Sequence, residues 1–320
     1  MTLRAWAELL RVSALFTVPG DALAGAAALG ARPNRGTALA MGASLCLYEA
    51  GMALNDWADR EEDAVDRPHR PIPSGRVSPP AALTAAGALT AAGLGLAALA
   101  GRPALAVGTA LAATVWAYDI HLKHTPAGPL AMGAARSLDL LLGATATSGR
   151  GDTARPGGAR HPAVAGRGPD RWSGARTALP SASLLGAHTV AVTTVSRHEA
   201  QGGSTAAPLA ALAATAALGV AAGRRPASPV PAAHRRTGPG APAVAGALAA
   251  VYVGTAARPL LHAALNPSPP LTQRAVGGGI RAMIPLQAAL AARGGAAGVA
   301  LGVMALVPLA RALARKVSPT

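Results

Sequence analysis

The hydrophobic residues of this chain gather into long runs that are separated by short polar segments. A helix that crosses the hydrocarbon core of a bilayer needs about 20 mostly apolar residues, and a helix satisfies its own backbone hydrogen bonds in lipid. The pattern therefore predicts an all-α fold, a multi-pass transmembrane helical bundle of about nine helices. The expected helices cover residues 12–31, 37–56, 80–100, 103–120, 129–147, 178–196, 206–223, 241–264 and 277–310, the last as one helix or as two divided at "RGGAAG".

The polar segments between these runs predict the loops. Two of them, 148–177 and 223–240, are rich in Gly, Pro and Arg. Such a composition is typical of segments without regular structure. We therefore expect two mobile loops within a single integral-membrane domain that covers residues 1–320. The first apolar run continues past the length of a cleavable signal peptide, so we expect it to be the first span.

Composition and charge agree with a membrane protein. The chain is 51% hydrophobic and 13% charged, whereas soluble domains are about a quarter charged. The net charge of +15 does not indicate a nucleic-acid partner, because the sequence lacks stacking aromatics and zinc-ligand patterns. The single cysteine, Cys46, excludes a disulfide framework. Arg greatly exceeds Lys, which is typical of a GC-rich genome, and we expect a bacterial plasma membrane.

One polar segment, "ALNDWADREEDAVDRPHRPIPSG" at 53–75, holds six of the chain's 14 Asp and Glu residues. Within it Asn55, Asp59 and Asp63 have the spacing i, i+4, i+8. On a helix each step of four residues turns about 400°, so the three side chains share a sector of about 80°. Clustered carboxylates repel each other unless a cation neutralises them, and Mg²⁺ prefers a few carboxylates together with water and phosphate oxygens. The stripe predicts a Mg²⁺–diphosphate site; the alternative is a solvated acidic helix end that pairs with nearby arginines.

Two neighbouring features favour the site. The acidic segment adjoins an apolar run, and ionisable groups at a membrane span are candidates for function. Arg67, Arg70 and Arg76 follow on a proline-rich stretch, and guanidinium groups are well suited to binding phosphate oxygens.

The string "NDWADREEDAVDRPHRPIPSGRVS" resembles the first signature of the UbiA superfamily of intramembrane prenyltransferases, in which N-D-x-x-D-x-x-x-D precedes an R-P-I-P-S-G loop. Two weaker likenesses accompany it: "YDIHLK", which contains Tyr118 and Lys123, and "AARSLDLLLGA", which contains Arg136 and Gly143. The order of the apolar runs is similar to the nine-helix architecture of that superfamily. The nearest likeness is to a branch that includes EboC-like proteins.

The resemblance implies a transferase of isoprenoid biosynthesis. Mg²⁺ would hold the diphosphate of a polyprenyl donor, ionisation would give an allylic cation, and an aromatic or other small acceptor would capture it. The partners would be the polyprenyl diphosphate, an acceptor that the sequence does not identify, and membrane lipid. The metal ligands would include Asn55, Asp59 and Asp63, the last two catalytic together with Lys123, and the diphosphate would contact Lys123, Arg67, Arg70 and Arg136.

The second signature of the superfamily is reduced here. Where that signature has several aspartates, this chain has "VSRHEAQGGST", in which Glu199 is the only carboxylate. The resemblance implies that Glu199 is a metal ligand and catalytic, helped by Gln201, and that His198 is an acid, a base or a phosphate contact. The alternative is a loop with an internal ion pair.

Several alternatives stay open at this level. Lys123 suits a snorkelling anchor as well as a diphosphate ligand, and Asp139, three residues after Arg136, can be the partner of that arginine. A non-catalytic isoprenoid-binding or scaffolding protein fits the reduced second signature. A cation transporter fits less well, because it would place its acids in the middle of a span. The resemblance implies cytoplasmic motif loops, which would place the Arg-rich 148–177 segment outside, against the positive-inside tendency.

Overall fold

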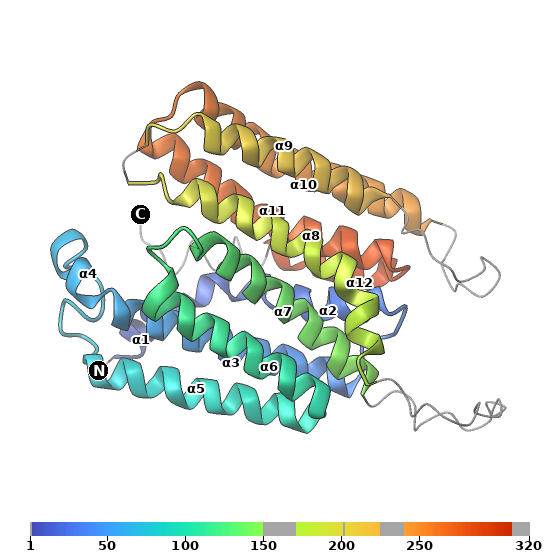
Figure 1. The fold of residues 1–320 in the computed structure, drawn as a ribbon, viewed down its shortest axis with the longest axis horizontal. Coiled ribbons are helices and arrows are strands. Elements are labelled where there is room, and N and C mark those ends of the chain that lie inside the picture. The colour runs from blue at the N-terminus through green and yellow to red at the C-terminus, as the bar shows by residue number, and fades with distance from the viewer. Residues whose placement is uncertain (1, 150–170, 201, 225–239, 309–320) are drawn as a thin grey trace.

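The computed structural model describes residues 2–149, 171–200, 202–224 and 240–308, and these residues are helical without a strand. The long helices lie side by side along one common direction (Figure 1), with α3, α5, α6 and α7 on one side, α9 and α10 on the other, and α8 and α11 between them. The α-helices are α1 Leu3–Leu9, α2 Pro19–Ala28, α3 Arg35–Ala58, α4 Arg60–Asp66, α5 Pro79–Ala100, α6 Arg102–Ala117, α7 Gly128–Ser148, α8 Ser173–Ser196, α9 Ala206–Gly223, α10 Ala241–Leu265, α11 Pro269–Arg293 and α12 Ala297–Met304; η1 Val12–Thr17 is a 3₁₀ helix and η2 Tyr118–Leu122 is a π turn.

The predicted transmembrane bundle is confirmed. Within the described residues, seven helices are long and apolar enough to cross a membrane, namely α3, α5, α6 with η2, α8, α9, α10 and α11. Helix α7 has 21 residues but carries Arg136 and Asp139, and α2 belongs to a shorter apolar segment, Leu15–Ala28. With these two and the other short apolar segment, Ala297–Pro308, the described part of the chain has ten candidate segments, close to the predicted nine.

The predicted boundaries are wrong in three places. The first run, expected as one helix over 12–31, is divided into η1 and α2, because Pro19 lacks a backbone N–H and therefore starts a new helix. The last run starts earlier than expected, at Pro269; its division between α11 and α12 at Gly294–Gly295, where Gly295 has φ 90°, agrees with the two-helix reading of that run. Helix α8 begins at Ser173, inside a segment expected as loop. The rest of the two expected mobile loops, 150–170 and 225–239, lies outside the described residues.

Glycines allow the helix backbones to approach each other closely. A Cβ on Gly143 of α7 would lie 2.4 Å from the Cα of Ala22 in α2, and a Cβ on Gly25 of α2 would lie 2.3 Å from the carbonyl oxygen of Leu140. Small residues at helix contacts are typical of membrane bundles. Helix α7 is therefore fixed against α2 by close contact of the two backbones.

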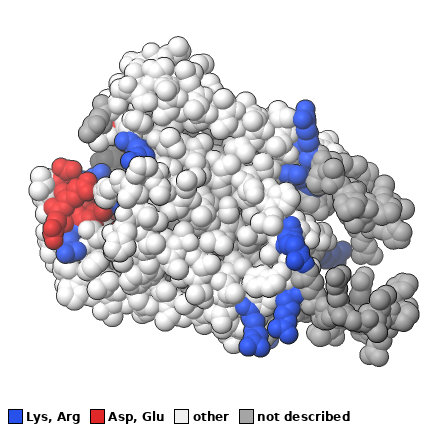
Figure 2. Space-filling model, in the orientation of Figure 1, with Lys and Arg blue, Asp and Glu red and all other residues white. Residues whose placement is uncertain are grey.

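The two ends of the bundle differ in charge. We call the end with loops 59–78, 118–127, 196–205 and 266–268 the motif end. Figure 2 shows Asp and Glu gathered at that end and only Lys and Arg at the opposite end of the visible face, among the described residues. Arginines at the ends of helices on the opposite side include Arg32, Arg35, Arg102, Arg224 and Arg293.

Candidate functional site

The acidic stripe lies where α3 continues into α4. Asp59 separates the two helices with φ −85° and ψ 3°. The i→i−4 hydrogen bonds nevertheless continue through the junction, from Asp59 N to Asn55 O (3.0 Å) and from Asp63 N to Asp59 O (2.8 Å). The three residues therefore follow each other along one hydrogen-bonded helical path, with the spacing that the sequence indicates.

The π turn η2 brings two more polar side chains to this stripe. The wide turn closes with a hydrogen bond from Lys123 N to Tyr118 O (2.9 Å). Lys123 donates through Nζ to Asp59 Oδ2, and Asn55 donates through Nδ2 to Oδ1 of the buried Asp119 (3.1 Å). The residues that the sequence places on two separate segments therefore meet at one site, and Asp119 joins them.

Two buried carboxylates, Asp63 of the stripe and Asp56 beside it, share an arginine partner. Arg70 Nη1 lies 2.6 Å from Asp63 Oδ2 and 3.5 Å from Asp56 Oδ1. Arg11 Nη2 lies 3.2 Å from Asp56 Oδ1, and Arg67 Nη1 lies 3.4 Å from Asp63 Oδ1. Because both acids are buried, these ion pairs offset much of the free energy that unpaired carboxylates would cost.

Arg76 has a structural contact rather than a contact with the acidic stripe. It binds Glu8 of α1, with Nη1 2.6 Å from Oε2, and donates to the carbonyl oxygen of His69 (2.6 Å). The hydrogen bond from Arg76 holds the pKa of the Glu8 carboxyl below its usual range. This pair fastens α1 to the loop that follows α4.

The donor set fits a hard divalent cation. Ligand atoms of Asp59, Glu62 and His124 all lie within 4.8 Å of one another. Asp59 is half-buried, and Glu62 and His124 are exposed. Carboxylate oxygens beside solvent are ligands that Mg²⁺ prefers, whereas the ammonium of Lys123 contacts Asp59 and competes with a metal there. The residues at this end can therefore hold Mg²⁺.

The loop of the reduced second signature lies at the same end. Arg197 Nη1 donates to Thr125 O (2.5 Å), and Gly203 N donates to Pro267 O (2.8 Å). His198 and Glu199 are half-buried in the turn after α8. Burial raises the pKa of the Glu199 carboxyl, and the charge of Arg67 lowers it in part. The loop faces the first motif. The internal ion pair of the alternative reading does not form among the described residues, and Gln201 lies outside them.

Arg136 belongs to a different cluster, inside the bundle. Its Nη1 lies 2.8 Å from Asp21 Oδ2 and 3.9 Å from Asp139 Oδ2. Gln287 of α11 donates to Asp21 Oδ1 (2.6 Å), and Ser44 donates to Asp139. The nearer partner of Arg136 is therefore Asp21 and not the expected Asp139, and this cluster connects α2, α3, α7 and α11.

Five polar residues were missed as site candidates. Asp56 and Glu62 lie within the acidic segment but off the predicted stripe, and Asp119 and His124 flank the Lys123 that the resemblance selects. Only tertiary contacts reveal these four as neighbours of the motif. Glu49 of α3 is buried, and neither of its carboxylate oxygens has a hydrogen-bond partner among the described residues; its place in an apolar run was the signal that could have found it.

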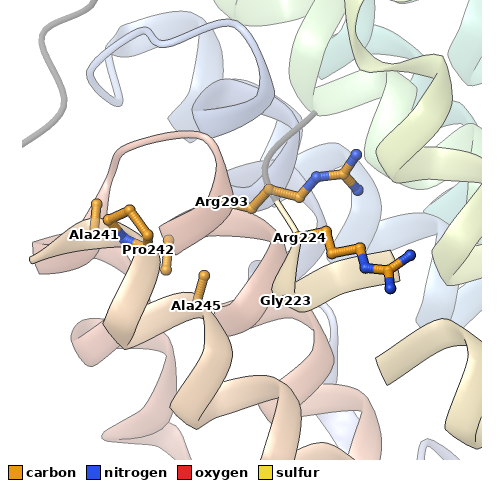
Figure 3. Close-up of a pocket in the computed structure, with 7 residues that line it drawn as sticks. Gly223, Arg224, Ala241, Pro242, Ala245 and Arg293 are labelled. Carbon is orange, nitrogen blue, oxygen red and sulfur yellow. The ribbon is translucent and has the colours of Figure 1, made fainter. Parts of the chain in front are cut away.

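A small pocket at the opposite end contains none of the predicted site residues. It is lined by Gly223, Arg224, Ala241, Pro242, Ala245, Ala292 and Arg293. Figure 3 shows the side chains of Arg224 and Arg293 extending in the same direction, away from Ala241 and Pro242. The pocket belongs to the basic end and not to the acidic site.

Comparison with known proteins gives a consistent result. Digeranylgeranylglyceryl phosphate synthase of Methanopyrus kandleri is 45% identical over 85 residues, which are 25% of this chain and 30% of that protein. The synthase of the same name from Ignicoccus hospitalis is 33% identical over 147 residues, which are 46% of this chain and 48% of that protein. The matched segments thus span less than half of either relative. A UbiA homologue from Archaeoglobus fulgidus, solved with GPP and Mg²⁺ bound, has the same fold, with TM-score 0.55 and 16% identity over 95% of this chain and 99% of that one.

The match to a whole family covers most of the chain. The UbiA prenyltransferase family matches residues 13–264, a range that includes the acidic stripe, the π turn and the loop with Glu199. The bundle, the acidic end and this match agree: the chain belongs to the UbiA prenyltransferase family, whose members are integral membrane proteins.

Proposed function

We propose that this protein transfers a polyprenyl group from a prenyl diphosphate to a small acceptor, aromatic or other, within the membrane. The observation that carries the proposal is the pairing of the stripe acids Asp59 and Asp63 with the cations Lys123 and Arg70 at the motif end. The Archaeoglobus fulgidus homologue with GPP and Mg²⁺ bound supports a prenyl diphosphate donor and a magnesium ion. A scaffolding protein that binds an isoprenoid without reaction is the alternative that the experiment below tests.

The acidic residues would hold the metal. Asn55, Asp59 and Asp63 would be ligands from α3 and α4, and Glu199 would be the ligand from the loop after α8. Mg²⁺, when bound, neutralises the charge that develops on the leaving diphosphate. The half-buried position of Glu199 keeps its carboxylate close to the other motif but leaves it accessible to a ligand.

The basic residues would bind the diphosphate. Lys123 contacts Asp59, and Arg67 and Arg70 contact Asp63, so all three cations already surround the acidic stripe. Each has further N–H groups that can donate to phosphate oxygens. Fixed positive groups stabilise a leaving diphosphate more than water does, because they need no reorganisation. His198, in the facing loop, would be a further phosphate contact.

Arg136 would contribute in another way. The sequence resemblance implies a substrate contact, but the structure gives its guanidinium the carboxylate of Asp21 as its nearest ionic partner. We infer that Arg136 positions α2, α7 and α11 around the space where the prenyl chain would lie. We also infer a bacterial plasma membrane with cytoplasmic motif loops.

The test compares three variants in membranes with radiolabelled prenyl diphosphates of different length. Asp59→Asn and Glu199→Gln each remove a proposed ligand, and we expect prenylated lipid and released diphosphate to fall at least 100-fold for the first. Glu61→Gln is the control, because Glu61 is exposed and pairs only with Arg60 (3.2 Å) among the described residues. A glyceryl phosphate lipid belongs in the acceptor panel, since the relatives are named for such a product. Donor binding without diphosphate release in the wild type would establish the scaffold instead.

A further inference from the structure

A groove between α10 and α11 is lined by three arginines, a histidine and two apolar residues. We call it the α10–α11 groove, and its lining residues are Arg258, Pro259, His262, Leu271, Arg274 and Arg281. Three of the six are arginines and one is a histidine, and none is a carboxylate. The groove shares no residue with the acidic site at the motif end.

The charges of this groove have no counterpart in the described part of the chain. Arg258, Arg274 and Arg281 are exposed at the surface of the bundle, and no ion pair to any of them is formed by the described residues. All three lie on helices that are long and apolar enough to cross a membrane. Charged groups in such helices raise the free energy of the folded protein in the membrane unless they have a partner or reach the interface. An anion bound in the groove would therefore stabilise these arginines.

The groove opens toward the membrane surface at the motif end. Arg274 follows the first residue of α11 by five positions and Arg258 precedes the last residue of α10 by seven, so their Cα atoms lie about 8 and 10 Å from those helix ends. Arg281 lies deeper, but its guanidinium folds back over Gly277, where a Cβ would be 3.3 Å from Nη1. The guanidinium groups of Arg258 and Arg274 are therefore within reach of the level of lipid headgroups, and that of Arg281 points toward this level from deeper in the bundle.

Close packing shapes the floor of the groove. A Cβ on Gly278 of α11 would lie 3.0 Å from Cγ of Pro259 in α10, so the two helices touch there and the arginines stand on both sides of the contact. Leu261 and Leu265 of α10 and Ile280 of α11 are exposed beside them. A basic recess next to exposed apolar residues suits a ligand with a phosphate group and hydrocarbon chains.

We propose that the α10–α11 groove binds the phosphate group of an anionic glycerophospholipid, whose acyl chains lie along the exposed apolar residues of α10 and α11. Arg258 and Arg274 bind the phosphate from the two sides, and Arg281 closes the inner end. The site requires no prenyl transfer, so it stands independently of the proposed function. Free phosphate presents the same chemistry to the arginines without the chains, and the experiment distinguishes the two sources.

The test measures lipid retention by native mass spectrometry on the full chain, purified and supplied with equal amounts of phosphatidylglycerol and phosphatidylcholine. We expect the wild type to retain phosphatidylglycerol preferentially, and Arg258→Gln/Arg281→Gln to reduce that preference about tenfold. The control is Arg32→Gln/Arg102→Gln, which removes two exposed arginines at the opposite end and should leave the preference unchanged. Equal losses in both double variants would overturn the proposal, because they would reflect net charge alone.

Two further measurements keep the proposal testable if the glutamine variant does not fold, and they distinguish a lipid from free phosphate. Arg258→Lys/Arg281→Lys keeps the charge but loses the planar guanidinium groups; it should still prefer anionic lipid over phosphatidylcholine but no longer favour phosphatidylglycerol over a fatty acid. A lysine variant that behaves as the wild type would overturn the phosphate assignment. Inorganic phosphate should displace phosphatidylglycerol only at a large molar excess; displacement at equal concentration would overturn the lipid assignment.

Discussion

Arg70 connects two buried acids that belong to different helices. Its Nη1 lies within 3.5 Å of both Asp56 and Asp63, and among the described residues each acid keeps one other arginine when Arg70 is removed. Removing one partner of a buried ion pair is more harmful than removing both, because a charge is left without compensation. Arg70 therefore contributes to stability as well as to the proposed diphosphate site.

We expect Arg70→Gln to lower the free energy of unfolding by about 2–3 kcal/mol. Unfolding of the purified protein in increasing sodium dodecyl sulfate, followed by circular dichroism, measures the change. Glu61→Gln serves for comparison, because the exposed Arg60–Glu61 pair should contribute less than about 1 kcal/mol. Similar losses in the two variants would show that the buried acids do not depend on Arg70.

Lys123 competes with a metal ion for Asp59. Because its ammonium contacts the carboxylate of Asp59, Lys123→Gln should tighten Mn²⁺ binding, measured by electron paramagnetic resonance without substrate, by about tenfold. The same variant should weaken binding of a non-hydrolysable prenyl diphosphate analogue. A lysine that only snorkels to the interface would leave both affinities unchanged, which would refute its place in the site.

At the scale of elements, α1 is held to the motif end by Glu8 and Arg76. Since the hydrogen bond from Arg76 lowers the pKa of the Glu8 carboxyl, this pair stabilises docked α1 above the unfolded pKa, and the contribution is lost as pH falls through the lower, folded value. We therefore expect the fluorescence of Trp6, which lies two residues before Glu8, to change below about pH 4.5. Glu8→Gln should already show the acidic signal at pH 7; a full transition retained in that variant would exclude the pair as its cause.

The contact between α2 and α7 leaves no room for a methyl group. Gly143→Ala would place a Cβ 2.4 Å from the backbone of Ala22, so the helices must separate, and we expect a loss of about 1–3 kcal/mol. Gly246→Ala on α10 meets nothing within 4 Å and should be neutral or slightly stabilising. Thermal unfolding in detergent measures both; equal midpoints would show that the α2–α7 contact relaxes freely.

Among the elements, the sequence predicted best the helices whose length is set by the thickness of the bilayer. A span must be apolar for about 20 residues, so helices such as α9 and α10 were predicted within one residue of their observed bounds. The spacing of Asn55, Asp59 and Asp63 predicted their common helical path for the same local reason. Other contacts depend on which helices pack together, and no local pattern contains that information. They are the ion pair between Arg136 and Asp21, the hydrogen bond between Asn55 and Asp119 and the contacts of Arg70 with two acids.

At the scale of the whole molecule, the orientation in the membrane can be measured directly. The proposed orientation places the motif end in the cytoplasm. In a Cys46→Ala background, Ser74→Cys at the motif end and Arg32→Cys at the opposite end offer two exposed positions. A membrane-impermeant maleimide should label the second from outside intact cells and the first only after lysis. The reverse labelling pattern would refute the proposed orientation.

In the π turn after α6, the number of residues is as important as their identity. The turn accommodates one residue more than an α-helical turn, and Lys123 follows directly after it. Deleting any one residue from 118–122 would rotate the next side chain by about 100° and turn the ammonium away from α3. Chimeras between this protein and its relatives should therefore exchange residues 118–122 as a whole. A single-residue gap in the alignment there would separate Lys123 from Asp59 of the acidic helix even if both residues were retained.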